Sequence, residues 1–146
     1  MHVILRFEIE RAIMRGELDV ATVPEKWNVR MDELLGATPA KDAEGCLQDV
    51  HWSSLAIGYF PSYLLGAMMA AQLAHHCRQA VPDMDANIAD GEFAHILTWL
   101  REKVHDHGVL YPSMDEPLLE AVGERLEPSY FIEYLEEKYR AIYQLA

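Results

Sequence analysis

The stretch Gly45-Cys-Leu-Gln-Asp-Val-His-Trp52 leads, through Gly58-Tyr-Phe-Pro-Ser-Tyr63, into the most apolar part of a chain of 146 residues. It offers an amide, a carboxylate, an imidazole, an indole and two phenols over a short distance. Pro61 suits the first turn of a helix, and residues 64–71 carry no polar side chain. A polar and aromatic cluster beside an apolar helix is typical of one wall of a binding site. The same side chains could instead cap helices and fill a core.

Outside this stretch, apolar residues recur at helical spacing, which predicts an all-α fold of about six helices and no strand. The expected helices cover residues 2–15, 24–35, 61–80, a segment from an Asp90-Gly91 cap to Gly108, residues 118–122 and residues 128–146. In the first of them Leu5, Ile9 and Ile13 form the apolar stripe, and Arg6, Glu10 and Arg11 lie off it.

Two of these helices are expected to need apolar neighbours. The segment 64–71 is apolar on all sides, which is typical of a helix surrounded by others. The last helix is expected to bury one face, made of Phe131, Leu135, Tyr139 and Ile142. A chain of this length supplies few neighbours, and large exposed apolar patches favour self-association. We therefore expect a homo-oligomer, a dimer or larger.

Composition and length limit the class of protein. The length suits one domain, so we expect a single helical domain over residues 1–146. With 51% hydrophobic and 25% charged residues, the chain has a globular composition. Its net charge of −12 argues against nucleic acid or a membrane surface as partner.

The chain is expected to be cytoplasmic. Its two cysteines, Cys46 and Cys77, have no spacing typical of a disulfide framework. Residues 1–6 lack the longer apolar core of a signal peptide. The apolar run 55–71 is shorter than the roughly 20 residues of a membrane span, and it contains Pro61.

Seven histidines raise the question of a metal site. Zinc needs three or four ligands that converge on one point. His75 and His76 are neighbours and so face different directions on a helix, and His105 and His107 lie at a helix end. Glu92-x-x-His95 matches one half of a di-iron site without the other half. We expect no metal site in this chain.

The central motif, Gly-x-x-Gln-Asp-x-His-Trp followed by Gly-Tyr-Phe-Pro-Ser-Tyr-x-Leu-Gly, resembles a signature of the carboxypeptidase Taq family of thermostable zinc metallocarboxypeptidases. The segments 2–10, 42–45 and 128–139 also resemble that family, so the resemblance covers nearly the whole chain. It implies the C-terminal helical part of a neurolysin-like metallopeptidase fold. It also implies an enzyme that releases C-terminal residues from peptides with zinc, or cobalt, as its metal.

The family's longer N-terminal part carries a His-Glu-x-x-His zinc helix, a further glutamate ligand and an arginine segment that recognises the substrate carboxylate. None of these is present in this chain. The resemblance therefore implies a C-terminal fragment that forms one wall of the active-site cleft and is inactive alone. The alternative is a non-catalytic helical domain that keeps the family fold as an interaction or dimerisation module.

The resemblance also assigns roles to single residues. Tyr59 matches the tyrosine that stabilises the oxyanion in the wider group of neurolysin-like and angiotensin-converting-type enzymes. His51 matches a histidine that contacts the substrate backbone, and Tyr63 is the alternative to Tyr59. The family is usually rich in glycine between His51 and Tyr59, where this chain has Ser53, Ser54 and Leu55. This departure leaves substrate specificity open.

Four further residues of the motif are expected to support the site. Gln48 and Asp49 are expected to orient His51 and its loop, Trp52 to pack, and Gly45 to adopt a backbone conformation that other residues cannot.

Overall fold

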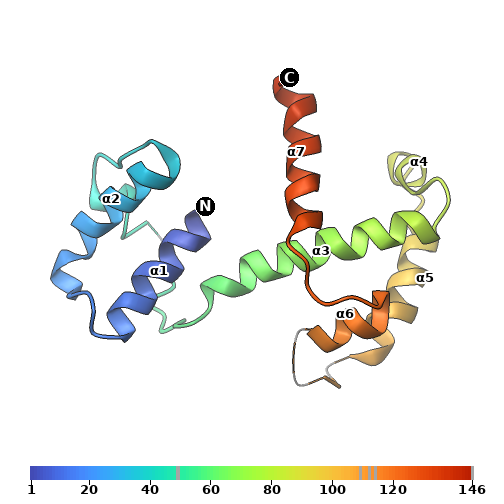
Figure 1. Cartoon of the computed structure of the whole chain (residues 1–146), viewed down its shortest axis with the longest axis horizontal. Helices are drawn as coiled ribbons and strands as arrows, with labels where there is room; N and C mark the ends of the chain where they lie inside the picture. Colours follow the sequence, from blue (N-terminus) through green and yellow to red (C-terminus); the bar gives the residue numbers. More distant parts are fainter. Residues whose placement is uncertain (49, 109, 112, 114, 146) are drawn as a thin grey trace. The chain divides into compact units, whose positions relative to one another are not determined.

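The computed structural model describes residues 1–48, 50–108, 110–111, 113 and 115–145 (Figure 1). Over these residues it contains seven α-helices, three short 3-10 helices and no strand. The helices are α1 (His2–Met14), α2 (Val23–Leu35), α3 (Phe60–Ala80), α4 (Met84–Ala89), α5 (Ala94–Lys103), α6 (Asp115–Val122) and α7 (Ser129–Tyr143). The 3-10 helices are Val20–Thr22, Asp42–Glu44 and His105–His107. The prediction of an all-α fold is confirmed.

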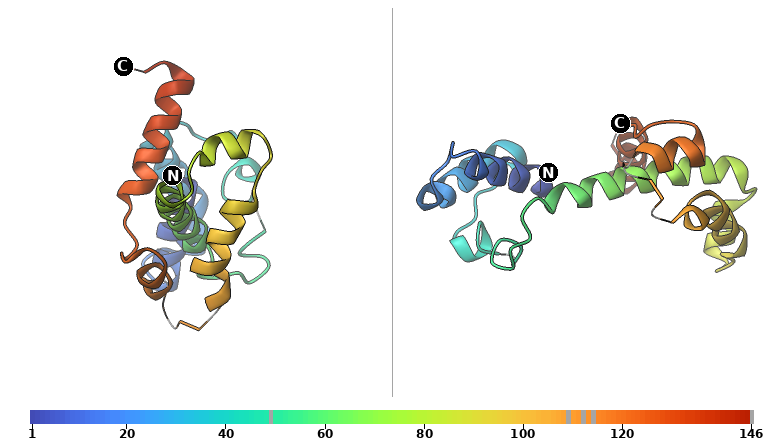
Figure 2. Two further views of the ribbon diagram at one scale, coloured as in Figure 1. Left: turned by 90° about the vertical axis from the view of Figure 1, so that its right-hand side faces the viewer. Right: turned by 90° about the horizontal axis from the view of Figure 1, so that it is seen from below.

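The chain divides into two compact units, Met1–Leu65 and Gly66–Ala146. In the first unit, α1 and α2 lie side by side, as Figures 1 and 2 show from different directions. Their facing side chains form a buried core that also includes one cysteine of the following loop; it consists of Leu5, Ile9, Val23, Trp27, Met31 and Cys46. The four-residue spacing within each helix explains why these side chains share one face.

Glycine ends α2 where the sequence predicts it. Gly36 has a φ of 63°, which is in the left-handed region, and its amide donates to the Asp32 carbonyl at 2.8 Å. Only glycine adopts this conformation readily, so the helix ends and the chain turns. The loop that follows carries the central motif to Phe60, the first residue of α3.

In the second unit, a buried glutamine ties α3 to the segment between α6 and α7. Gln72 is fully buried, its Nε2 donates to the Arg125 carbonyl at 2.9 Å, and its Oε1 accepts from the Glu127 amide at 3.0 Å. Apolar burial elsewhere in this unit is small. Its main cluster consists of Cys77, Val81 and Met84, with Ile96 and Trp99 packed against it.

Several boundaries in the second unit differ from the expected ones. The Asp90-Gly91 pair does not begin a helix: it ends α4, and Gly91 has a φ of 78°. The helix expected to reach Gly108 stops at Lys103, because the backbone leaves helical geometry at Val104 and continues as a 3-10 helix. Aspartate and glycine suit both ends of a helix, and the six residues of α4 are too few to show helical periodicity.

The expectation that α7 buries an apolar face is wrong for this chain. The described part of α7 has no buried residue. Phe131 and Leu135 are half-buried, Tyr139 is 40% exposed and Ile142 is 57% exposed. Helical periodicity identifies the apolar face correctly, but it does not show whether the same chain supplies the surface that covers that face.

The apolar α3 is also incompletely covered. Along its whole length only Phe60, Gln72 and Cys77 are buried. Among the described residues, no helix is both long and apolar enough to cross a lipid bilayer.

We predict that Gln72→Leu lowers the free energy of unfolding by about 1–3 kcal/mol, because it leaves two backbone groups in the segment 125–127 without a partner. Urea unfolding followed by circular dichroism measures this change. Gln79→Leu is the matched control, since Gln79 lies on the same helix, is exposed and bonds through its side chain to His75 rather than to backbone groups of the segment 125–127. Equal loss of stability in both variants would contradict the role given to Gln72.

Candidate functional site

The structure brings three of the predicted site residues, His51, Tyr59 and Tyr63, into one cluster within the first unit. His51 Nε2 and the Tyr63 hydroxyl are 3.0 Å apart and share a hydrogen bond. The imidazole stacks on the Tyr59 ring at 6.0 Å between centroids, and the two tyrosine rings meet edge to face at 5.2 Å. Tyr59 is 48% and Tyr63 49% exposed, so both phenols can be reached from solvent.

The start of α3 positions the two tyrosines. Tyr59 directly precedes the helix and Tyr63 lies one turn further on, so their side chains share one side of it. Phe60 lies between them in sequence, is buried and contacts the His51 ring at 4.9 Å. The buried ring thus anchors the helix start against the loop that carries His51.

A tight turn presents His51. The His51 carbonyl accepts from the amides of Ser54 and Ala56 at 3.2 and 2.9 Å. Leu55, within this turn, has a φ of 60°, a left-handed conformation that costs free energy for a residue with a large side chain.

Glu10, a buried glutamate that lies off the apolar stripe of α1, binds residues on both sides of this turn. Glu10 is 6% exposed. Its Oε2 accepts from Trp52 Nε1 at 2.9 Å, and its Oε1 accepts from the Gly58 amide at 2.7 Å. Trp52 follows His51 and Gly58 precedes Tyr59, so one carboxylate binds next to both predicted functional residues.

Arg6, one turn before Glu10, is buried as well. Its guanidinium lies over the Trp27 ring at 4.9 Å and over the Phe60 ring at 5.8 Å. A signal for both residues was present in the sequence. Arg6 and Glu10 are four residues apart and each directly follows a residue of the buried stripe, Leu5 and Ile9, so they lie on one line at its edge.

The supporting residues of the motif have different surroundings. Trp52 packs edge to face on Trp27 at 6.4 Å. A Cβ at Gly45 would lie 3.1 Å from Pro39 Cγ and 3.3 Å from Trp27 Nε1, so close packing favours glycine there. The φ of Gly45 is −114°, and the position therefore requires no left-handed conformation. Gln48 is exposed, and Asp49 lies outside the described residues.

The two cysteine thiols are buried, and their surroundings disfavour the thiolate. Burial, and then the negative charge of Asp42, raises the pKa of Cys46 above its ordinary value. Burial likewise raises the pKa of Cys77. A thiol, rather than the reactive thiolate, is therefore present at neutral pH.

The described residues do not assemble a metal centre. No group of three or more histidine, cysteine, aspartate or glutamate side chains among them could hold a metal ion. His75 bonds to Gln79 and packs on Tyr130, and His76 lies 3.7 Å from a carboxylate oxygen of Glu124. The cluster of His51, Tyr59 and Tyr63 can instead donate hydrogen bonds to an oxygen that carries negative charge.

Comparison with known sequences finds that this chain is similar to carboxypeptidases. A profile of the carboxypeptidase Taq (M32) metallopeptidase family matches residues 1–139. Carboxypeptidase 1 of Bacillus subtilis is 47% identical over 145 residues, which are 99% of this chain and 29% of that protein. Thermostable carboxypeptidase 1 of Pyrococcus furiosus is 44% identical over 138 residues, or 94% of this chain and 28% of that protein.

Comparison with solved structures also finds carboxypeptidases. The M32 carboxypeptidase from Deinococcus radiodurans is 34% identical and superimposes with a TM-score of 0.91 over 99% of this chain and 29% of its own. The Pyrococcus furiosus carboxypeptidase is 43% identical, with a TM-score of 0.90 over 94% of this chain and 28% of its own. The chain thus spans less than a third of the length of these relatives and corresponds to their C-terminal part.

We predict that the purified chain retains no stoichiometric zinc after dialysis, because its described residues offer no converging ligand set. Elemental analysis by mass spectrometry measures the bound metal. One equivalent of zinc per chain that resists dialysis would contradict this prediction.

Proposed function

Because the chain belongs to the carboxypeptidase Taq (M32) metallopeptidase family, as its motifs predicted, we propose that it forms one wall of the active-site cleft of a carboxypeptidase that releases C-terminal residues from peptides. The observation that carries this proposal is the exposed cluster of His51, Tyr59 and Tyr63. The chain is proposed to act as a single helical domain, residues 1–146, inactive by itself.

The metal of the enzyme, zinc or alternatively cobalt, is proposed to be held by the part of the protein that this chain does not span. The described residues do not fit a metal ion. Their proposed contribution is therefore to bind and orient the peptide and to stabilise charge that develops on it.

We assign the oxyanion donor to Tyr59 and the contact with the substrate backbone to His51. The geometry supports the choice between the tyrosines. The Tyr63 hydroxyl is bonded to His51 Nε2, whereas the Tyr59 hydroxyl bonds to none of the described residues. Tyr59 can therefore turn its hydroxyl to an oxygen of the substrate. Hydrogen-bond donors already in place where charge develops are worth more than those that must first reorganise.

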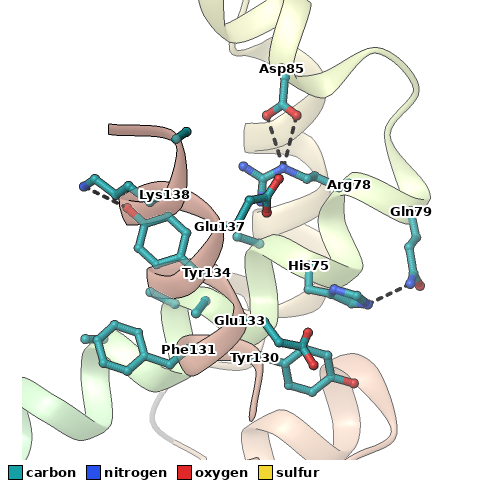
Figure 3. A pocket seen from close by; sticks show the side chains of 15 residues that line it. His75, Arg78, Gln79, Asp85, Tyr130, Phe131, Glu133, Tyr134, Glu137 and Lys138 are labelled. Carbon is teal, nitrogen blue, oxygen red and sulfur yellow. Dashed lines mark hydrogen bonds and ion pairs between the residues drawn. The ribbon is translucent and has the colours of Figure 1, made fainter. Parts of the chain in front are cut away.

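The apolar surface of the second unit supports a fold that is completed by another chain segment. A groove of about 990 Å³ runs between α3 and α7 (Figure 3). On the side of α7 it is lined by Tyr130, Phe131 and Tyr134. The ion pair between Arg78 and Asp85 lies at its border. Four alanines of α3 line it, Ala67, Ala70, Ala71 and Ala74, followed along the helix by His75, Arg78 and Gln79.

Small residues at this spacing let another helix approach closely. In the whole enzyme we propose that the remaining portion of the protein covers this surface. In the isolated chain, a second copy covers it, which makes the chain a homo-oligomer.

The alternative function is a non-catalytic helical module that binds another protein or dimerises. The exposed α7 and the groove favour it, because these features need a partner and no chemistry. The two hypotheses differ in the role of the cluster of His51, Tyr59 and Tyr63, which only the first one needs. The proposed location in both cases is the cytoplasm, and peptides, rather than nucleic acid or membranes, are the proposed substrates of the enzyme.

The proposed role of this chain in the active site can be tested in a chimera. The chimera joins the preceding portion of Bacillus subtilis carboxypeptidase 1 to this chain. We predict that Tyr59→Phe in this chimera lowers kcat by roughly a hundredfold to a thousandfold with little change in KM, because one oxyanion donor contributes about 2.7–4 kcal/mol to the transition state. Steady-state hydrolysis of a blocked dipeptide measures both constants.

Tyr63→Phe is the comparison for this prediction: it removes the neighbouring phenol and its hydrogen bond to His51 but leaves Tyr59 in place, so it should lower kcat much less than Tyr59→Phe. His51→Ala should lower kcat and also raise KM. If Tyr63→Phe loses kcat while Tyr59→Phe keeps it, the assignment of the tyrosines is wrong. Full activity of both variants would favour the non-catalytic alternative.

We predict that the isolated chain sediments as a dimer or larger species at micromolar concentration. Exposed apolar surface on α3 and α7 outweighs the repulsion expected from a net charge of −12. Substituting Phe131 and Ile142 together by serine should shift the chain toward monomer. A monomeric unsubstituted chain in sedimentation velocity would refute the prediction.

A further inference from the structure

We propose that Glu10 is a positioning residue that fixes the arrangement of His51 and Tyr59 by holding both ends of the turn between them. The proposal rests on the roles given to these two residues above. Glu10 belongs to α1, about forty residues away in sequence from the turn it binds.

The contacts of Glu10 divide evenly between the two ends of the turn. Oε2 accepts from the Trp52 indole at 2.9 Å, next to His51, and Oε1 accepts from the Gly58 amide at 2.7 Å, next to Tyr59. Hydrogen bonds to a carboxylate are shorter and stronger than those between neutral groups. One carboxylate thereby joins the Trp52 side chain to the Gly58 backbone, and each of these two residues is adjacent in sequence to a proposed functional residue.

The turn needs such support because its own conformation is strained. Leu55 has a φ of 60°. A leucine in the left-handed region persists only where the surrounding structure imposes it. The bonds from the Ser54 and Ala56 amides close the turn locally, but they do not connect its ends to the core.

The position of Glu10 is itself rigid. Its neighbour Ile9 and Leu5 on the same helix are 1% and 0% exposed and belong to the core shared with α2. Glu10 is buried, and both of its oxygens are bonded. It therefore has no free atom to offer a substrate, so its effect on the reaction passes through His51 and Tyr59.

The substitution Glu10→Gln tests the proposal with little change of shape. A glutamine has one acceptor oxygen instead of two, so either Trp52 or Gly58 loses its partner. In the chain itself, the nitrogen–proton NMR signals of the Trp52 indole and the Gly58 amide should both move. In the chimera, kcat should fall about tenfold to a hundredfold while KM changes less, since small displacements of catalytic groups act mainly on the reaction step.

Glu8→Gln is the matched control. Glu8 lies on the same helix and binds Arg30 of α2 at 2.9 Å, away from the turn. It should lower the melting temperature slightly and leave both NMR signals and kcat unchanged. Glu10→Asp keeps both acceptor oxygens and should recover part of the kcat lost in Glu10→Gln, which provides a second test if the glutamine variant folds poorly.

The outcomes separate the two proposals. Unmoved Trp52 and Gly58 signals in Glu10→Gln, an unchanged kcat, or an equal loss of kcat in Glu8→Gln would each overturn the positioning role. An inactive unsubstituted chimera would refute the proposed function instead, and the NMR signals would still decide whether Glu10 holds the turn.

Discussion

The packing of Trp27 between α1 and the loop that carries the central motif is the contact on which the first unit depends. The ring is 1% exposed, lies under the Arg6 guanidinium and meets Trp52 edge to face. Its Nε1 lies close to where a side chain at Gly45 would begin. Because this one side chain touches a helix and two points of the loop, the loop has little freedom to move away from α1. The carboxylate of Glu10 can then reach both Trp52 and Gly58.

Much of this arrangement is predictable from local sequence. Gly36 and Pro24 identify the ends of α2, and Pro61 identifies the start of α3. Such signals act within one helical turn. The bonds of Glu10 join residues more than forty positions apart, and local periodicity carries no information about such pairs. The sequence shows that Glu10 is a polar residue beside the apolar stripe, but it does not show that Trp52 and Gly58 are its partners.

The apolar face of α7 illustrates a second limit. Phe131 and Leu135 recur at helical spacing, and the face they form is real. Whether it is buried depends on surfaces elsewhere, and the chain spans less than a third of the length of its relatives. Burial is a property of the whole fold, whereas periodicity is a property of the segment. A sequence that is part of a larger fold therefore gives correct helices and incorrect burial.

The two units differ in how far the chain completes its own packing. The cluster of His51, Tyr59 and Tyr63 is supported by contacts from within residues 1–65: the core of α1 and α2, the buried Phe60 and the carboxylate of Glu10. Such a cluster can keep its geometry before any other part of the protein is added, which in the proposed active site would lower the cost of ordering it on substrate binding. The second unit instead leaves the apolar face of α7 largely exposed. Assembly and catalysis would then depend on separate sets of residues, so that α7 variants impair association while leaving the arrangement of His51 and Tyr59 intact.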